Sequence, residues 1–395
     1  MSRTDDSKKR VCYFYDPDIG NYMFSPNHDM KPIRVRMVHC LVYEYQLYRH
    51  VTIMEPHRAT PDEMKIFHDE DYIDMLRRAK PEHMNCNLDA LSYYNIGDDC
   101  PLFDGIFEYC QITTGGSIAG AQSLNSGEYD IAINWAGGMH HAKWYKASGF
   151  CFVNDIVLAI LQLLKKHQRV LYVDIDCHHG DGVEEAFYTT DRVMTISFHK
   201  FGNFFPGTGN YDSIGYGKGL HYAVNFPLHE GITDLSYMIV FRGVISKAVE
   251  RFRPNAIVMQ CGADSLAMDR LGCFNLTVAV SVFAFFLNSL KLGHGELVKY
   301  IRSFNLPLLL VGGGGYTLSN VGRCWTYETA VAAGVEISNE LPICEHYSLY
   351  APTYTLHAPP TNMEDKNTRS HLETISARIY DSLRYVCAPS APLRG

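Results

Sequence analysis

The chain has 395 residues, of which 47% are hydrophobic and 20% are charged. This composition excludes an intrinsically disordered chain and supplies enough apolar material for a large core. The formal net charge of −8, from 35 basic and 43 acidic residues, gives no indication of direct nucleic-acid binding.

Short apolar runs recur along the chain, and each ends in a glycine-rich or polar segment. In chain order they are DIAINWAGG from Asp130, RVLYVDIDCHHGDG from Arg169, RVMTISFHK from Arg192, NAIVMQCGADS from Asn255 and LPLLLVGGGGY from Leu306. Such runs are typical of strands that are buried on both faces. Helical stretches separate them, most clearly at 233–252, where apolar residues recur at helical spacing. The alternation predicts one large α/β domain with an open, mostly parallel β-sheet and helices on both faces.

Polar residues gather where the predicted strands end. They are His140, His141, Asp174, Asp176, His178, Asp181, Asp264 and Tyr316. In open parallel sheets, ligands bind at the carboxyl ends of the strands. The functional site is therefore expected at this edge of the sheet.

Two later segments depart from the alternation. Residues 278–290, VAVSVFAFFLNSL, are almost wholly apolar. A membrane span needs about 20 residues, so we expect a buried helix or strand here and no membrane contact. After about residue 365 the composition turns polar, which predicts a helix followed by a loose tail.

Asp176 and His178 are spaced for metal binding. They lie two residues apart after a predicted strand, so an extended chain would put both side chains on one side. Asp264, from another strand end, would complete three protein ligands and leave a position open for water and substrate. Two carboxylates and one imidazole suit a hard or borderline divalent ion such as zinc or iron(II).

His140 and His141 follow two glycines, and Asp174 and Asp181 flank the metal motif. A carboxylate bonded to one ring nitrogen fixes the tautomer, so two such pairs in different environments would separate a base from an acid. Two buried structural histidines are the alternative. Tyr316 ends GGGGY, which lacks the Gly-Lys-Ser/Thr of a phosphate loop. We interpret it as a flexible or closely approaching loop that places a phenol near a developing oxyanion.

Longer motifs carry a family resemblance. NWAGGMHHAK, ASGFCFVNDIVLAI, VDIDCHHGDGVEEAFYTTDRVMTISFHK, FFPGTG, QCGADSLAMDRLGCFNL and LLLVGGGGYTLSNVGRCWTYET together resemble a class I histone deacetylase. The resemblance implies an arginase/deacetylase-like catalytic domain at 11–380, with an atypical apolar insertion at 278–290. A flexible N-terminus at 1–10 and a tail at 381–395 would flank it. YFYDPDIGNY and LYAPTYTLH point to the branch that acts in nuclear co-repressor complexes.

The resemblance also implies roles for single residues. Zinc would bind to Asp176, His178 and Asp264, and the catalytic group would be His140 with Asp174, His141 with Asp181, and Tyr316 as donor to the acetyl carbonyl. A narrow acyl-lysine channel would be walled by Gly149, Phe150, Phe205, His178 and Leu271, and Asp99 would hold the substrate backbone at its rim. A structural potassium ion is implied near Asp174 and Ser197.

The implied activity is zinc-dependent hydrolysis of N6-acetyl-lysine on histone tails, which releases acetate. The implied partners are acetylated histone tails and co-repressor proteins, and the implied role is transcriptional repression. The implied location is the nucleus, and also the cytoplasm. Twelve cysteines without a C-x-x-C pair agree with a reducing compartment.

Departures from the family pattern affect regulation. Lys31 and Arg270 match residues that bind an inositol phosphate, but Ser319 stands where an arginine is usual and Asn27 where a glycine is usual. Loss of an arginine removes a charge-assisted contact to phosphate, which places this regulation in doubt. Asp29 replaces a usual proline and adds negative charge at the rim. The segment 278–290 is either a lineage-specific surface element or a retained intron.

Three alternatives stay open at this point. A polyamine deacetylase would share the fold and the site. A binuclear arginase-like enzyme is disfavoured, because His179 and Gly180 follow His178 where bridging carboxylates would be needed. A catalytically impaired co-repressor scaffold would keep the fold without turnover.

Overall fold

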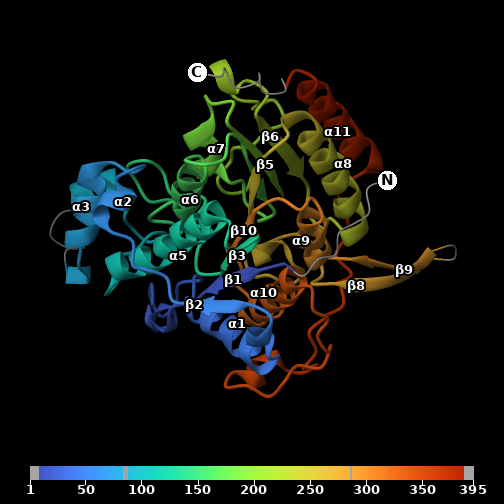
Figure 1. The fold of residues 1–395 in the computed structure, drawn as a ribbon, viewed down its shortest axis with the longest axis horizontal. Helices are drawn as coiled ribbons and strands as arrows, with labels where there is room; N and C mark the ends of the chain where they lie inside the picture. Colours follow the sequence, from blue (N-terminus) through green and yellow to red (C-terminus); the bar gives the residue numbers. More distant parts are fainter. Residues whose placement is uncertain (1–8, 83–87, 285–286, 387–395) are drawn as a thin grey trace.

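The computed structural model describes residues 9–82, 88–284 and 287–386. Its main sheet consists of β1 (Val11–Phe14), β2 (Thr52–Met54), β3 (Ile131–Asn134), β4 (Val170–Asp174), β5 (Val193–Lys200), β6 (Ala223–Leu228), β7 (Ala256–Gln260) and β10 (Leu308–Val311). The strand order is β2-β1-β3-β10-β7-β4-β5-β6, and every neighbouring pair is parallel (Figure 1). The predicted open parallel sheet is confirmed.

Helices connect and cover the strands. They are α1 (Ile33–Glu44), α2 (Pro61–Met64), α3 (Glu70–Arg78), α4 (Leu88–Tyr93), α5 (Ile106–Ser126), α6 (Asp155–Leu163), α7 (Asp181–Phe187), α8 (Asp234–Phe252), α9 (His294–Arg302), α10 (Leu318–Ala333) and α11 (Arg369–Leu383). The helix predicted at 233–252 is α8, and the helix predicted after residue 365 is α11.

Alternate residues of the central strands are buried on opposite faces. In β10, Leu308 and Leu310 join one apolar cluster, whereas Leu309 and Val311 join another. The second cluster contains side chains of α6 and α7, the first contains side chains of α1, α8, α9 and α10, and α5 contributes side chains to both. Because successive side chains of a strand point to opposite faces, a strand covered on both sides must be apolar throughout. This is why the predicted strands read as unbroken apolar runs.

The five predicted runs are β3, β4, β5, β7 and β10. β1, β2 and β6 lie outside those predictions. β2 is a three-residue edge strand, and β6, at the other edge, contains Pro227. Short length and proline are tolerated at sheet edges, where ladder hydrogen bonds are missing on one side, so edge strands carry a weaker sequence signal.

Strand order determines which loops meet. β3, β10, β7 and β4 are consecutive neighbours in the sheet. The loops after them carry the histidine pair, the glycine run, Asp264 and Asp176, in that spatial order. Residues far apart in the chain are therefore brought to one edge.

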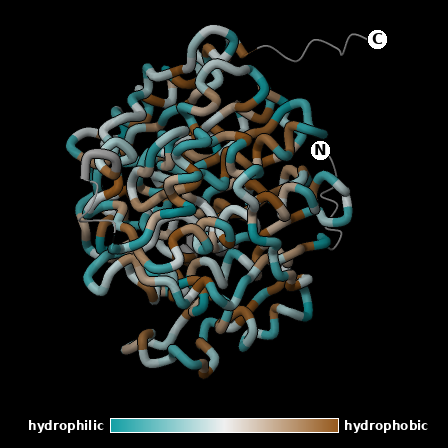
Figure 2. Tube along the Cα trace, turned by 90° about the vertical axis from the view of Figure 1, so that its left-hand side faces the viewer, coloured by the Kyte–Doolittle hydropathy of each residue, from teal (hydrophilic) through white to brown (hydrophobic). Residues whose placement is uncertain are grey.

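The outer turns carry many hydrophilic positions, and hydrophobic positions run through the interior (Figure 2). Among the described residues, none of the helices combines the length and the apolar character that crossing a membrane requires. The ends of the chain predicted to be loose lie largely beyond this description, which omits residues 1–8 and 387–395.

The apolar segment 278–290 forms part of a separate antiparallel hairpin of β8 (Val280–Ala284) and β9 (Leu287–Leu292). Within the described part of the chain, these strands pair with each other and not with the main sheet, and they project from the body of the molecule (Figure 1). At the base of the hairpin, Val278, Ala279 and Leu292 are buried, and Val280 faces Leu292. The segment therefore forms strands and not a helix, and these strands lie outside the main sheet.

We expect the hairpin to be removable. Opposed residues of an antiparallel pair lie about 4.5–5.5 Å apart between Cα atoms, so one glycine can join Val280 to Leu292 when residues 281–291 are deleted. The deletion variant should keep the circular dichroism spectrum and an unfolding midpoint within about 4 °C of the parent. An equally long deletion inside α8 should abolish folding. Insoluble protein from the hairpin deletion would show that the core needs this segment.

Candidate active site

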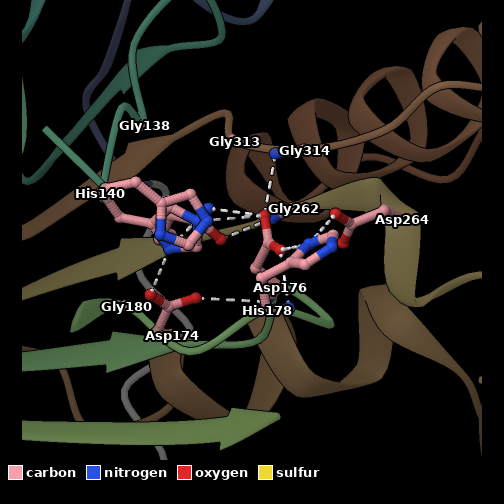
Figure 3. Close-up of polar contacts among 12 residues, drawn as sticks. Gly138, His140, Asp174, Asp176, His178, Gly180, Gly262, Asp264, Gly313 and Gly314 are labelled. Carbon is pink, nitrogen blue, oxygen red and sulfur yellow. Dashed lines mark hydrogen bonds and ion pairs between the residues drawn. The ribbon is translucent and has the colours of Figure 1, made fainter. Parts of the chain in front are cut away.

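Three predicted ligands converge from two strand ends. Asp176 and His178 follow β4, and Asp264 lies in a 3-10 turn (Ala263–Ser265) after β7. His178 Nδ1 lies 3.0 Å from Asp176 Oδ1 and 3.0 Å from Asp264 Oδ2. Both carboxylates are fully buried, and Figure 3 shows the imidazole of His178 beside them. The arrangement brings two oxygens and one nitrogen to a single point.

Hydrogen-bond donors hold the first of these carboxylates rigidly. The donors to Asp176 are Gln260 Nε2 at 2.8 Å, the His178 amide at 2.9 Å and the Gly314 amide at 2.8 Å. They come from β7, from the loop after β4 and from the loop after β10. The Asp176 side chain is therefore oriented by three segments of the sheet edge, two of which are distant in sequence.

The carboxylates need a cation. Burial, followed by the negative charge of Asp176, raises the pKa of Asp264 above its ordinary value. Burial also opposes ionisation of Asp176, but His140 and His178 hold the pKa of that carboxyl well below its usual range. Buried like charges are unfavourable unless a cation or hydrogen bonds compensate them. The donor set therefore fits a divalent metal ion.

Cys177 belongs to the same close group, whose potential ligand atoms all lie within 4.8 Å of one another. Burial, followed by the negative charges of Asp264 and Asp176, raises the pKa of the Cys177 thiol well above its usual value and so disfavours the thiolate form. A protonated thiol is a poor metal ligand. The Cys177 amide contributes instead, because it donates to Asp264 Oδ1 at 2.9 Å.

Two histidine–aspartate pairs lie beside the metal group, the name used from here on for the candidate ligands Asp176, His178 and Asp264. His140 Nδ1 is 2.8 Å from Asp174 Oδ2, and His141 Nδ1 is 2.7 Å from Asp181 Oδ1. The pairing is the one that the family resemblance implied. A further residue, Lys143, lies 2.6 Å from the other oxygen of Asp181.

The two histidines differ in charge state. Burial, followed by the nearby His140, lowers the pKa of His141 to about 3. Burial also disfavours charge on His140, but Asp174 and Asp176 outweigh it and raise the pKa of His140 to about 9. These surroundings favour the neutral form of His141, which a base requires, and the protonated form of His140. The environments separate the pair, as expected from the sequence.

The glycine run after β10 leaves room for the ligands. A Cβ atom on Gly314 would lie 2.0 Å from Asp264 Oδ2, and one on Gly313 would lie 2.0 Å from Gln260 Nε2. Gly313 also has φ of +137°, which side chains disfavour. The loop is therefore of the closely approaching kind.

Arg34 holds this loop from within the protein. Its guanidinium is buried and donates to the carbonyls of Gly315 at 2.8 Å and Gly313 at 2.5 Å. Tyr316, which follows, is 7% exposed. Burial raises the pKa of the Tyr316 phenol well above its usual value, so the hydroxyl remains a hydrogen-bond donor.

Aromatic rings lead to these groups. The Phe205 ring lies 4.9 Å from the His141 ring, and the Phe150 ring lies 5.7 Å from the Tyr316 ring, both edge to face. A Cβ on Gly149 would lie 2.5 Å from His141 Cδ2 and 2.8 Å from Phe205 Cε1, so position 149 has no room for a side chain. Leu271 is partly buried, and its amide donates to Asp269, which also accepts the amide of Tyr316. The predicted channel residues therefore lie around the histidines and Tyr316.

A polar groove borders Phe150, one of the aromatic wall residues. It is lined by Ser25, Asn27, His28, Asp29, Gly97, Asp98, Asp99, Pro101 and Phe150. His28 Nε2 lies 3.3 Å from the carbonyl oxygen of Asp99, and the His28 ring packs against Phe150. The structure thus places the predicted rim residue Asp99 near the channel wall.

Some supporting residues escaped prediction. Arg34 binds the backbone carbonyl of Gly315, and Lys143 binds the carboxylate of Asp181, which is distant in sequence. No local sequence pattern reveals either contact. His28 likewise gave no signal. Gln260 could have been noticed, because it is a polar residue at the end of the apolar run of β7.

The fold and the site are those of a metal-dependent hydrolase, with buried candidate metal ligands at the edge of a parallel sheet. The histone deacetylase domain matches residues 28–332. Histone deacetylase 1 of Homo sapiens is 55% identical over 392 residues, which cover 99% of this chain and 78% of the relative. Histone deacetylase HDAC1 of Drosophila melanogaster is 55% identical over 98% of this chain and 71% of its own length, and Histone deacetylase 19 of Arabidopsis thaliana is 54% identical over 100% and 76%. The chain belongs to the class I histone deacetylases.

Metal binding can be tested apart from activity. Asp264→Asn keeps the shape of the side chain but removes a negative ligand, so metal per chain should fall from about one to near zero by mass spectrometry. Zinc added to chelator-treated parent protein should raise its unfolding temperature, since an ion at 1,000 times its Kd contributes about 4 kcal/mol. Asp71→Asn, an exposed change in α3, should leave both measurements unaltered. Full metal content in the Asp264 variant would contradict the assignment.

Proposed function

We propose that this chain is a zinc-dependent lysine deacetylase that hydrolyses N6-acetyl-lysine on histone tails. The observation that carries the proposal is the metal group of Asp176, His178 and Asp264 with two histidine–aspartate pairs beside it, behind aromatic walls. The relatives named histone deacetylase support the same activity.

The channel suits a neutral acyl-lysine. Phe150 and Phe205 offer apolar faces to an aliphatic stem, and an acetylated amine carries no charge to desolvate. An ammonium group would lose its hydration without gaining a partner there. The exposed acidic residues Asp98 and Asp99 at the rim would favour the basic sequence around the modified lysine.

The chemistry follows from where each group lies. A zinc ion held by Asp176, His178 and Asp264 would supply Lewis-acid polarisation of the amide carbonyl and of an attacking water. Neutral His141 accepts the water proton, while Asp181 orients its ring. The Tyr316 hydroxyl donates to the carbonyl oxygen as negative charge develops on it. A dyad histidine returns a proton to the departing amine, so the products are acetate and lysine.

We expect Tyr316→Phe to lower kcat on an acetylated histone peptide by about 100-fold, since an oxyanion donor is lost. His141→Ala should lower it at least as much, because a general base contributes about 10²- to 10⁴-fold. Both variants should keep metal and the folded circular dichroism spectrum. Tyr216→Phe, at a residue that is 72% exposed, is the matched control.

Other outcomes would favour the alternatives. Faster turnover of acetylated spermidine than of the histone peptide would identify a polyamine deacetylase. A zinc-loaded parent protein with no turnover of either substrate, alone or with a co-repressor, would identify a scaffold. Full activity of Tyr316→Phe would remove the tyrosine from the mechanism.

We further propose that the chain acts as the catalytic subunit of a co-repressor complex in the nucleus, and also in the cytoplasm. The similarity to Histone deacetylase 1 over nearly the whole chain supports the complex and the nuclear location. A structural potassium ion is proposed near Asp174 and Ser197. These residues are directly paired between β4 and β5, close to the dyad of His140.

Inositol phosphate binding is proposed to be weak. Arg270 Nη2 forms an ion pair with Asp29 Oδ1 at 3.0 Å. Lys31 Nζ donates to the carbonyls of Ser25 and Pro26. Both basic groups are thus engaged by acceptors of the chain itself, and Ser319 adds no charge to replace the missing arginine.

The double change Asp29→Ala with Ser319→Arg should tighten binding of inositol hexakisphosphate at least tenfold by calorimetry. The reason is that a charge-assisted contact contributes about 1.5–3 kcal/mol. Glu336→Ala with Ser338→Arg, at exposed positions remote from Arg270, serves as the charge-matched control. Equal or tighter binding by the parent protein would contradict weak binding.

A further inference from the structure

The Asp269 carboxylate joins two loops of the site. Its Oδ1 accepts hydrogen bonds from the amides of Leu271 at 3.0 Å and Gly272 at 3.1 Å. Its Oδ2 accepts from the amides of Tyr316 at 2.8 Å and Thr317 at 3.1 Å. One side chain therefore binds the backbone of the channel wall and the backbone of the catalytic tyrosine.

Neighbouring bonds reinforce this junction. Thr317 Oγ1 donates to the carbonyl of Met268 at 2.8 Å, and Asn320 Nδ2 donates to the carbonyl of Ala267 at 3.0 Å. Asp269 also accepts the amide of Thr317, the N-cap residue of α10, a position where negative charge is favourable. The loop of residues 266–272 and the start of α10 are thus held together along their length.

The glycine run makes such an anchor necessary. Gly313 and Gly315 have φ of +137° and +132°, and glycine restricts the backbone least of all residues. Arg34 binds the carbonyls of this run from one side, whereas Asp269 binds the amides that follow it from the other. Between these two anchors lies the peptide that carries the phenol.

We propose that Asp269 is a positioning residue that sets the Tyr316 hydroxyl and the Leu271 wall relative to one another. The inference rests on the proposed role of Tyr316 as hydrogen-bond donor to the substrate carbonyl. Displacement of a catalytic group by about 1 Å can cost about 100-fold in rate. Asparagine cannot replace the carboxylate, because its NH₂ group would face two amide donors where an oxygen now accepts.

The test is a double-mutant cycle with Asp269→Asn and Tyr316→Phe, assayed on an acetylated histone peptide. In the parent background, Asp269→Asn should lower kcat by roughly 10- to 100-fold. In the Tyr316→Phe background it should lower kcat no further, since the hydroxyl is already absent. KM should rise in both backgrounds, because Leu271 loses its anchor in each.

Asp365→Asn is the matched control. Asp365 is partly buried and accepts the backbone amide of Asn367 at 2.8 Å, but it lies in a different loop, outside the site residues. This change should leave kcat and KM unaltered. Metal content and circular dichroism establish that every variant compared is folded and loaded.

The outcomes separate the inference from the proposed function. If Tyr316→Phe is fully active, the role of the tyrosine fails. If Tyr316→Phe is slow and Asp269→Asn lowers kcat by the same factor in both backgrounds, Asp269 does not act through the tyrosine and the inference is overturned. If Asp269→Asn does not fold, Asp269→Glu keeps the charge, displaces the two oxygens and enters the same cycle with the same criterion.

Discussion

Asp176 and Asp264 are buried carboxylates that face the same imidazole nitrogen, and the rest of the site depends on keeping them there. Like charges in a buried position need compensation from donors or a cation. Amides of Cys177, His178 and Gly314 supply part of it, which requires the loops after β4 and β10 to meet. A parallel sheet with this strand order provides that meeting, and a bound divalent ion would supply the remaining positive charge.

Space is as restrictive as charge around this pair. A Cβ on Gly262 would lie 2.1 Å from Asp176 Oδ2. Like Gly314, this residue leaves no space for a side chain, so only backbone can approach the two carboxylates here. Backbone without side chains cannot be held by apolar packing. Its position is set by polar anchors instead, namely Arg34 on carbonyls and Asp269 on amides. The metal group therefore dictates how the tyrosine beside it is supported.

The central strands and the three ligands could be predicted because both lie in local patterns: unbroken apolar runs, followed at once by Asp176, His178 or Asp264. The anchors could not. Arg34 binds Gly313, which lies 279 residues later in the chain, and it donates to a carbonyl, a group that every residue type possesses. The Asp29 and Arg270 ion pair likewise joins two loops without any local spacing. Contacts between residues that are distant in sequence produce no periodic pattern in the sequence, so they cannot be predicted from it.

The hairpin of β8 and β9 begins and ends at adjacent points, with Val280 opposite Leu292. Added chain between such points costs little, since loop-closure entropy grows only with the logarithm of length. This position, between the turn that carries Asp264 and helix α9, is therefore a suitable insertion site for a second domain. A fluorescent or affinity domain with close termini could be carried there, leaving the rim of the channel and both chain ends free.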